Sequence, residues 1–171
     1  MNNLWNDSEA EACGGDLLAL RVYSSRLIGQ DSDLVLHGGG NTSVKASYTD
    51  LFGDRHDGLY VKGSGWDLET IEAEGFSPVR LAVLCRLARL SSLTDSDMVR
   101  AQRGALLNPS APNPSVEAIL HAIIPYRFVD HSHADAVVTL TNTAQGEERI
   151  RSLYGDRVLI VPYVMPGFDL A

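Results

Sequence analysis

Apolar residues at helical spacing characterise the first thirty positions of the chain. They are Leu17, Leu18, Val22 and Leu27. Gly29 follows them as a helix stop signal, so we expect one helix over residues 8–30. Gly14 and Gly15 weaken its first half, because glycine is a poor helix former.

Short apolar runs of strand length come next. They cover residues 34–36, 43–46 and 59–62, and polar or glycine-rich segments separate them. The links are too short for the crossovers that join parallel strands. We therefore expect these strands to pair antiparallel.

Helical spacing returns after residue 78. We expect helices over residues 78–90, 95–106, 116–124 and 147–153, and strands over residues 128–133 and 157–161. Residues 136–140 fit a helix or a strand equally well. Thr94 or Asp95 is suited to cap the helix over residues 95–106, and Ser115 the helix over residues 116–124. The predicted fold class is α/β of the α+β type, in one domain over residues 1–171.

Composition narrows the choice of partners. The formal net charge is −8, from 14 Lys and Arg against 22 Asp and Glu, so we expect neither a nucleic-acid nor a membrane partner. A small phosphorylated substrate remains compatible, because one pocket can be locally positive. There is no signal-peptide pattern, and the longest apolar run, residues 158–165, is too short to span a membrane. Cys13 and Cys85 form no paired motif, and we expect a cytoplasmic protein.

Two histidines separated by one residue are the first chemical candidate. His131 and His133 would point to the same face of a strand, where both imidazoles can reach one ion. Zinc favours such nitrogen ligands. An incidental pair on a wet surface is the alternative interpretation.

Glu117 and His121 are the second candidate, four residues apart on a predicted helix. Glu117 either acts as a general base or is an exposed carboxylate at a helix start, where negative charge is favoured.

Two glycine loops, residues 38–40 and 63–65, are the third. With neighbouring hydroxyl and amide side chains they suit a phosphate, although tight turns between strands would have the same composition. The P-loop, the GxGxxG motif and the nucleophile elbow of lipases are all absent from the sequence. Lys45 and Lys62 lie beside these loops, and either could balance a phosphate charge or simply be solvated.

Four motifs in order carry a resemblance to a known family. They are residues 40–43 (GNTS), 62–65 (KGSG), 114–117 (PSVE) and 131–133 (HSH). On these the chain, from about Trp5 to Ala171, resembles the class II aldolase/adducin family. Residues 37–43, 61–67 and 162–169 look most like the aldolase part of bifunctional rhamnulose-1-phosphate aldolase/alcohol dehydrogenase proteins.

The resemblance implies a fold and a set of roles. The fold is a central, mostly antiparallel sheet flanked by helices in three layers, usually in a tetramer. His131 and His133 would be zinc ligands and Glu117 the catalytic acid/base, with a pKa raised by a partly dry site. The substrate phosphate would be held by Gly40, Asn41, Ser64, Gly65 and Ser115. Val116 departs from the second serine common in the family.

The family's third zinc histidine follows the stretch that matches the end of this chain. We therefore expect that ligand beyond Ala171, and we expect the domain to be incomplete at its C-terminus, with weak zinc binding and poor turnover. A dehydrogenase domain would follow in the parent protein.

The reaction implied is zinc-dependent cleavage of a ketose 1-phosphate in rhamnose metabolism. Rhamnulose 1-phosphate would give glycerone phosphate and lactaldehyde by way of an enediolate. The alternatives are a sugar-phosphate epimerase or dehydratase of the same superfamily, a non-catalytic adducin-like interaction module, or a generic α+β domain with an incidental histidine pair.

Overall fold

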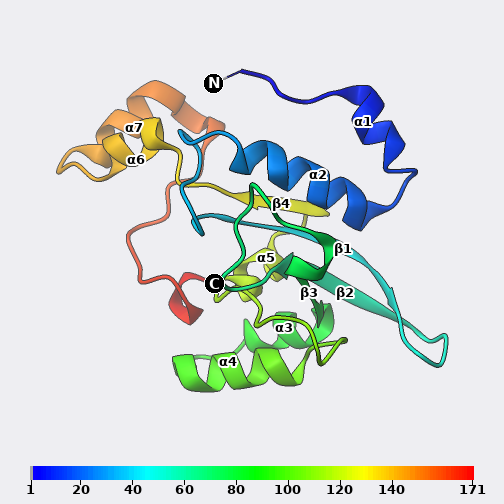
Figure 1. Cartoon of the computed structure of the whole chain (residues 1–171). Helices are drawn as coiled ribbons and strands as arrows, with labels where there is room; N and C mark the ends of the chain where they lie inside the picture. The colour runs from blue at the N-terminus through cyan, green and yellow to red at the C-terminus, as the bar shows by residue number, and fades with distance from the viewer. Residues whose placement is uncertain (1) are drawn as a thin grey trace.

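Four antiparallel strands form the central sheet of the computed structural model, which describes residues 2–171 (Figure 1). The strands are β1 (Asn41–Thr49), β2 (Arg55–Lys62), β3 (Phe76–Arg80) and β4 (Phe128–His131). Their order is β3-β2-β1-β4, and every neighbouring pair is antiparallel. The predicted fold class and the antiparallel pairing are confirmed.

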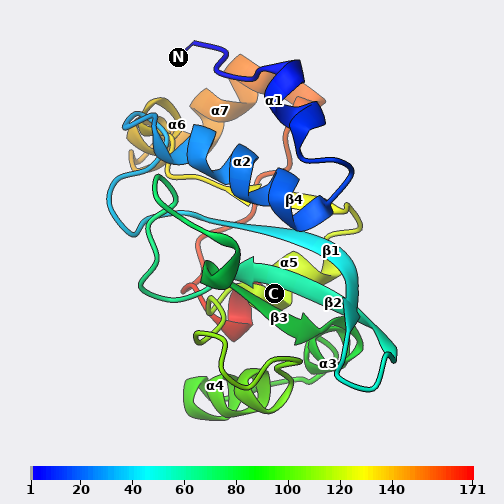
Figure 2. The ribbon, with the colours of Figure 1, turned by 45° about the vertical axis from the view of Figure 1, so that its right-hand side comes forward.

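Helices cover both faces of this sheet. They are α1 (Asp7–Ala12), α2 (Leu17–Gly29), α3 (Leu81–Leu87), α4 (Asp95–Gly104), α5 (Ala118–Ile123), α6 (Asp135–Thr141) and α7 (Gly146–Tyr154), with short 3-10 turns η1 (Ala73–Gly75), η2 (Gly155–Arg157) and η3 (Phe168–Leu170). Both views place α2 on one side of the sheet and α3 and α4 on the other (Figures 1 and 2). The result is the three-layer arrangement that the sequence predicted.

The side chains of β2 point alternately to the two faces of the sheet, and they contribute to two separate hydrophobic clusters. Leu59 and Val61 are fully buried against α3 and α5, whereas Tyr60 between them packs with the residues under α2. Successive side chains of a strand point to opposite faces, so one strand supplies both hydrophobic layers. Phe168 and Ala171 pack against the α3–α5 cluster and bring the end of the described chain back to the sheet.

The prediction of one continuous helix over residues 8–30 is wrong, because the structure divides this stretch into α1 and α2. The chain turns at Gly14 and Gly15, which adopt φ values of 62° and 82°, and α2 then starts afresh. Asp16 caps α2 by accepting hydrogen bonds from the backbone N–H groups of Leu18 and Ala19.

The two outermost strand predictions are also wrong. Residues 34–36 contain no strand, since 34 ends a turn and 35 and 36 have no regular structure. Residues 157–161 contain no strand either, and Leu159 is 90% exposed. Both are apolar runs without a neighbouring strand to pair with, and composition alone cannot supply that neighbour. Residues 136–140, left open by the sequence, lie in α6.

The prediction of one helix over residues 78–90 is wrong at its start, where the structure has the strand β3. The helix begins only at Leu81, and residues before it form an edge strand that contains Pro78. Proline fits an edge strand because it has no N–H to donate, while the Pro78 carbonyl still accepts from Leu107 N at 2.8 Å. The remaining predicted elements are confirmed, including α4 with its Thr94 cap.

Among residues 2–171, no helix is both long and apolar enough to cross a membrane.

Candidate active site

Three loops and the end of β4 surround one cavity of about 380 Å³. The loops precede β1, follow β2 and precede α5. The eight residues to which the resemblance assigned site roles all line this cavity: Gly40, Asn41, Ser64, Gly65, Ser115, Glu117, His131 and His133. The structure therefore brings together groups that lie more than ninety positions apart in the sequence, while their individual roles stay predictions.

Backbone hydrogen bonds tie the β2 loop to the loop before α5. Ser64 N donates to Asn113 O at 2.8 Å, and Ser115 N donates to Lys62 O at 3.1 Å. Gly63 and Pro114 form an isolated antiparallel bridge between these two bonds. Ser64 and Ser115 are consequently held on adjoining strands of a small ladder, where both can face one ligand.

Sheet register places Asn41 and His131 on the same face. They are partners in the antiparallel β1–β4 ladder, and opposed residues of such a ladder project to the same side. Asn41 Nδ2 donates to Glu117 Oε2 at 2.5 Å, and His131 Nδ1 lies 2.7 Å from the same oxygen. Glu117 is 7% exposed and immediately precedes α5. Its carboxylate is thus fixed between two strands and a helix.

The pKa of Glu117 is lowered in the structure, whereas the resemblance implied a raised pKa. Burial by itself would raise it, but the hydrogen bonds from His131 and Asn41, together with the electrostatic effect of His131, lower the pKa to about 2. The expected raised pKa assumed a dry site without donors. In the structure the carboxylate is ionised at neutral pH, which is the state that can accept a proton.

His121 does not join Glu117 in the cavity. It is 1% exposed, and its Nδ1 is hydrogen bonded to Ser43 Oγ at 2.8 Å. Burial lowers the pKa of His121 to about 4, against a raising effect of Glu117. His121 is therefore a neutral core side chain that joins α5 to β1.

Lys45 has a structural role rather than a phosphate-binding one. Its Nζ donates to the carbonyls of His121, Ile124 and Tyr126 at 3.0, 2.5 and 2.7 Å. These carbonyls lie at and just beyond the C-terminal end of α5, where a positive charge is favoured. Lys62, in contrast, lines the cavity.

Glycine is needed at position 40 because the loop before β1 passes close to β4. It adopts φ +66°, and a Cβ there would lie 2.7 Å from both His131 O and Val35 Cγ1. A side chain would push the loop away from the strand that carries the histidines. The glycine therefore sets the depth of the cavity at this point.

The imidazoles of His131 and His133 meet only some of the requirements of a metal site. The His131 and His133 ring centroids are 4.9 Å apart, and both rings line the cavity. Because Nδ1 of His131 contacts Glu117, Nε2 is the ring nitrogen left for an ion. Within residues 2–171 no group of three or more His, Cys, Asp or Glu side chains is arranged to hold a metal. Among the described residues, His131 and His133 are therefore the two imidazoles that line this cavity.

Some cavity residues were not selected from the sequence. Gly38, Gly39 and Gly63 belong to the glycine loops already noted. Val116 and Pro166 lie in motifs that carry the resemblance, but neither residue was assigned a role in the site. Pro166 shows that the segment after α7 returns to the site.

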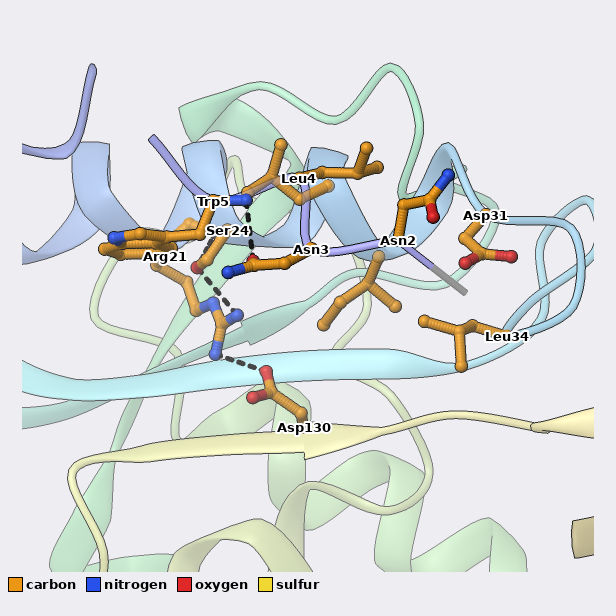
Figure 3. Close-up of a pocket in the computed structure, with 11 residues that line it drawn as sticks. Asn2, Asn3, Leu4, Trp5, Arg21, Ser24, Asp31, Leu34 and Asp130 are labelled. Atoms are coloured by element: carbon orange, nitrogen blue, oxygen red, sulfur yellow. Dashed lines mark hydrogen bonds and ion pairs between the residues drawn. The ribbon is translucent and has the colours of Figure 1, made fainter. Parts of the chain in front are cut away.

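A larger cavity, of about 490 Å³, lies under the N-terminal segment beside α2 (Figure 3). Arg21 extends from α2 into it and pairs with Asp130 of β4 at 2.6 Å, and its guanidinium also donates to Ser24. Arg21 is 1% exposed and its charge is already matched. None of the predicted site residues lines this cavity, so its size does not make it the active site.

Comparisons with known proteins agree with this geometry. The family model described as "Class II Aldolase and Adducin N-terminal domain" matches residues 20–171. A solved structure, the N-terminal class II aldolase domain of a conserved protein from Thermoplasma acidophilum, is 44% identical with a TM-score of 0.89, over 99% of this chain and 77% of that one.

A protein of Bacillus subtilis (strain 168), named an uncharacterized oxidoreductase, YuxG, is 36% identical over all 171 residues. The chain spans 25% of that protein's length. The family match covers most of the chain and the solved structure reproduces its fold, so the chain belongs to the class II aldolase and adducin family.

Proposed function

We propose that this chain carries the zinc-dependent aldolase site of a protein that cleaves a ketose 1-phosphate, with rhamnulose 1-phosphate as the leading substrate. The products would be glycerone phosphate and lactaldehyde. The observation that carries the proposal is the shared contact of Asn41 and His131 with Glu117, in a cavity that two serine- and glycine-containing loops border.

The loops supply neutral donors for the phosphate. Gly40, Asn41, Ser64, Gly65 and Ser115 line one cavity, and their backbone N–H groups, hydroxyls and amide suit phosphate oxygens. Buried Asn41 Oδ1 has no hydrogen-bond partner among the described residues. Since Asn41 Nδ2 is committed to Glu117, this oxygen is positioned to accept from a sugar hydroxyl.

His131 and His133 would hold the zinc ion, together with a third group that residues 2–171 do not supply. A bound zinc ion would supply Lewis acidity toward the substrate's oxygens.

Glu117 moves the proton. Cleavage breaks the bond between the third and fourth carbons of the ketose, whose electron pair stays on the third carbon. The ionised Glu117 accepts the proton of the hydroxyl on the fourth carbon as that carbon becomes the aldehyde, and it delivers this proton to the third carbon. In the direction of addition the ionised Glu117 removes that proton, which its low pKa allows at neutral pH.

The parent protein would join this site to a dehydrogenase domain. The length and printed name of the Bacillus relative support that arrangement. We propose further that the site works in a homo-oligomer in the cytoplasm.

Product analysis tests the proposal. The protein is incubated with zinc and a panel of ketose 1-phosphates, and glycerone phosphate is measured with a coupled dehydrogenase. Epimerised or dehydrated sugar without glycerone phosphate would identify an epimerase or dehydratase. No zinc binding and no turnover, even when a third ligand is present, would favour an adducin-like interaction module.

A further inference from the structure

Arg21 lies on α2 but contacts both of the strands that carry the site pair Asn41 and His131. Its Nη1 pairs with Asp130 Oδ1 of β4 at 2.6 Å and donates to Ser43 O of β1 at 3.3 Å. Figure 3 shows the guanidinium extending from α2, with the Asp130 carboxylate pointing toward it. One side chain of the helix therefore joins β1 to β4.

The guanidinium of Arg21 is buried and held in one orientation. Its Nε donates to Ser25 Oγ at 3.1 Å, and its Nη2 donates to Ser24 Oγ at 2.8 Å. With the two strand contacts, four of the five N–H donors of this side chain have partners. Ser25 Oγ also shares a hydrogen bond with Thr42 Oγ1 of β1 at 2.8 Å. A buried charge with these partners tolerates few other positions of the two strands.

This polar cluster lies on the face of the sheet opposite to the site. Thr42 and Asp130 are register partners across β1 and β4, and both contact side chains of α2. Successive side chains of a strand alternate between the two faces of its sheet. The next pair along the ladder, Asn41 and His131, consequently faces Glu117. One register serves both the cluster and the site.

Hydrophobic burial specifies the register of β4 only weakly. The strand has four residues, and among residues 2–171 it pairs with β1 alone. Its apolar side chains, Phe128 and Val129, point to different faces. A shift by one residue would leave one apolar side chain on each face, but it would turn His131 away from Glu117.

The ion pair distinguishes between the two registers. In a shifted register Val129 or His131 would stand opposite Arg21, in the place of Asp130. The buried guanidinium would then lose its counterion, which is strongly unfavourable. A buried ion pair often adds little stability over an apolar pair of similar size. The pair is therefore better suited to selecting one strand arrangement than to raising stability.

We propose that Arg21 is a positioning residue of the active site. Through Asp130 it fixes the register of β4 against β1, and it thereby brings His131 to Glu117. This inference rests on the proposed function, because it names the residue that orients the carboxylate's partner from the far side of the sheet.

A double variant separates positioning from stability. In Arg21→Met/Asp130→Leu an apolar pair replaces the ion pair, so we expect the midpoint of urea unfolding to stay close to that of wild type. Without the charge pair β4 populates both registers, and the backbone NOE contacts between positions 42 and 130 weaken. Wild-type contacts in this variant would overturn the inference.

The imidazole 15N signals of His131 give a second measurement at pH 7, without zinc or substrate. His131→Gln assigns them among the five histidines of the chain. They report the contact of Nδ1 with Glu117, and we expect them to shift and broaden in the double variant. Arg21→Lys keeps a positive charge beside Asp130 and moves them back toward wild type. Unshifted His131 signals in the double variant, or no recovery in Arg21→Lys, would refute the proposal.

Two arginines provide matched controls. Arg26 is on the same helix, but it donates to Ile71 O at 2.7 Å and contacts neither β1 nor β4 among its recorded polar partners. Arg100 lies on the exposed side of α4. Arg26→Met and Arg100→Met should leave the His131 signals unchanged, and an equal shift in Arg26→Met would mean that α2 is merely loosened. A register that depends on Arg21, without cleavage of any ketose phosphate by wild type, would count against the aldolase assignment alone.

Discussion

Asn41 and His131 are register partners across β1 and β4, and both contact Oε2 of Glu117, at 2.5 and 2.7 Å. The sheet thus fixes the carboxylate from two strands at once. Residues 41, 117 and 131 are far apart in the sequence, and strand pairing is what makes them neighbours. The contact explains why a buried carboxylate stays ionised at this site.

Stability depends on pH through His121. Its folded-state pKa of about 4 lies below the ordinary 6.5, so the folded protein binds fewer protons than the unfolded chain between these values. The contribution is complete above pH 6.5 and is lost as the pH falls through 4. We expect the free energy of unfolding to fall by up to about 3 kcal/mol across that window.

Urea unfolding at pH 7 and pH 4.5 measures this slope. His121→Gln is less stable than wild type at both values but shows a smaller difference between them. The low pKa of Glu117 acts at lower pH, between 4.5 and 2, so the two windows separate. An unchanged slope in His121→Gln would show that another group titrates.

Replacement of Gly40 should cost more than replacement of an unconstrained glycine. Gly40→Ala adds a Cβ 2.7 Å from the His131 carbonyl at φ +66°, and we expect a loss of about 2–3 kcal/mol. Gly53→Ala is the matched control, since φ is +87° there and no atom lies within 4 Å. It should cost about 1 kcal/mol by thermal unfolding. Equal losses would mean that the contact with β4 does not constrain the loop.

Replacement of Lys45 should lower the stability of the fold more than replacement of Lys62 does. Lys45→Met leaves three carbonyls near the end of α5 without their donor, and we expect a loss of about 2 kcal/mol in unfolding free energy. Lys62→Met gives up one hydrogen bond and removes a poorly compensated buried charge, so its loss is smaller. Chemical denaturation of both variants measures the difference. A more stable Lys45→Met than Lys62→Met would reverse the assignment of roles.

Zinc affinity should depend on the histidine pair. Equilibrium dialysis of His133→Gln is expected to show at least about tenfold weaker zinc binding than wild type, because one of two nitrogen donors is lost. His56→Gln is the control, since His56 pairs with Asp50 near the β1–β2 turn. Zinc bound equally by both variants would place the metal elsewhere.

Sequence reasoning found the residues of the cavity but not their contacts. Helical spacing made Glu117 and His121 one candidate, yet His121 is hydrogen bonded to Ser43 of β1 instead of joining Glu117 in the cavity. Likewise, Lys45 and Lys62 look equivalent beside their loops, and only register sends Lys45 to the end of α5. These contacts depend on which strand lies beside which helix.

The fold was predicted best where a local signal was present. Thr94 marks the start of α4, and residues 43–46 and 59–62 are strand-length runs between glycine-rich or polar segments that pair in the sheet. The run at 157–161 has the same apolar character but no partner strand. β3 was missed because Pro78 reads as a helix start when the edge position of its strand is unknown.

The central claim is that Glu117 moves a proton at the carbon next to a ketone in this cavity. The most direct measurement is NMR of glycerone phosphate in deuterated buffer with the zinc-supplied protein, which follows exchange of the proton on the hydroxymethyl carbon without needing the aldehyde. We predict exchange by wild type and by Arg100→Met, and a loss of roughly 10²- to 10⁴-fold in Glu117→Gln. Exchange that proceeds equally fast in Glu117→Gln and wild type would contradict the account.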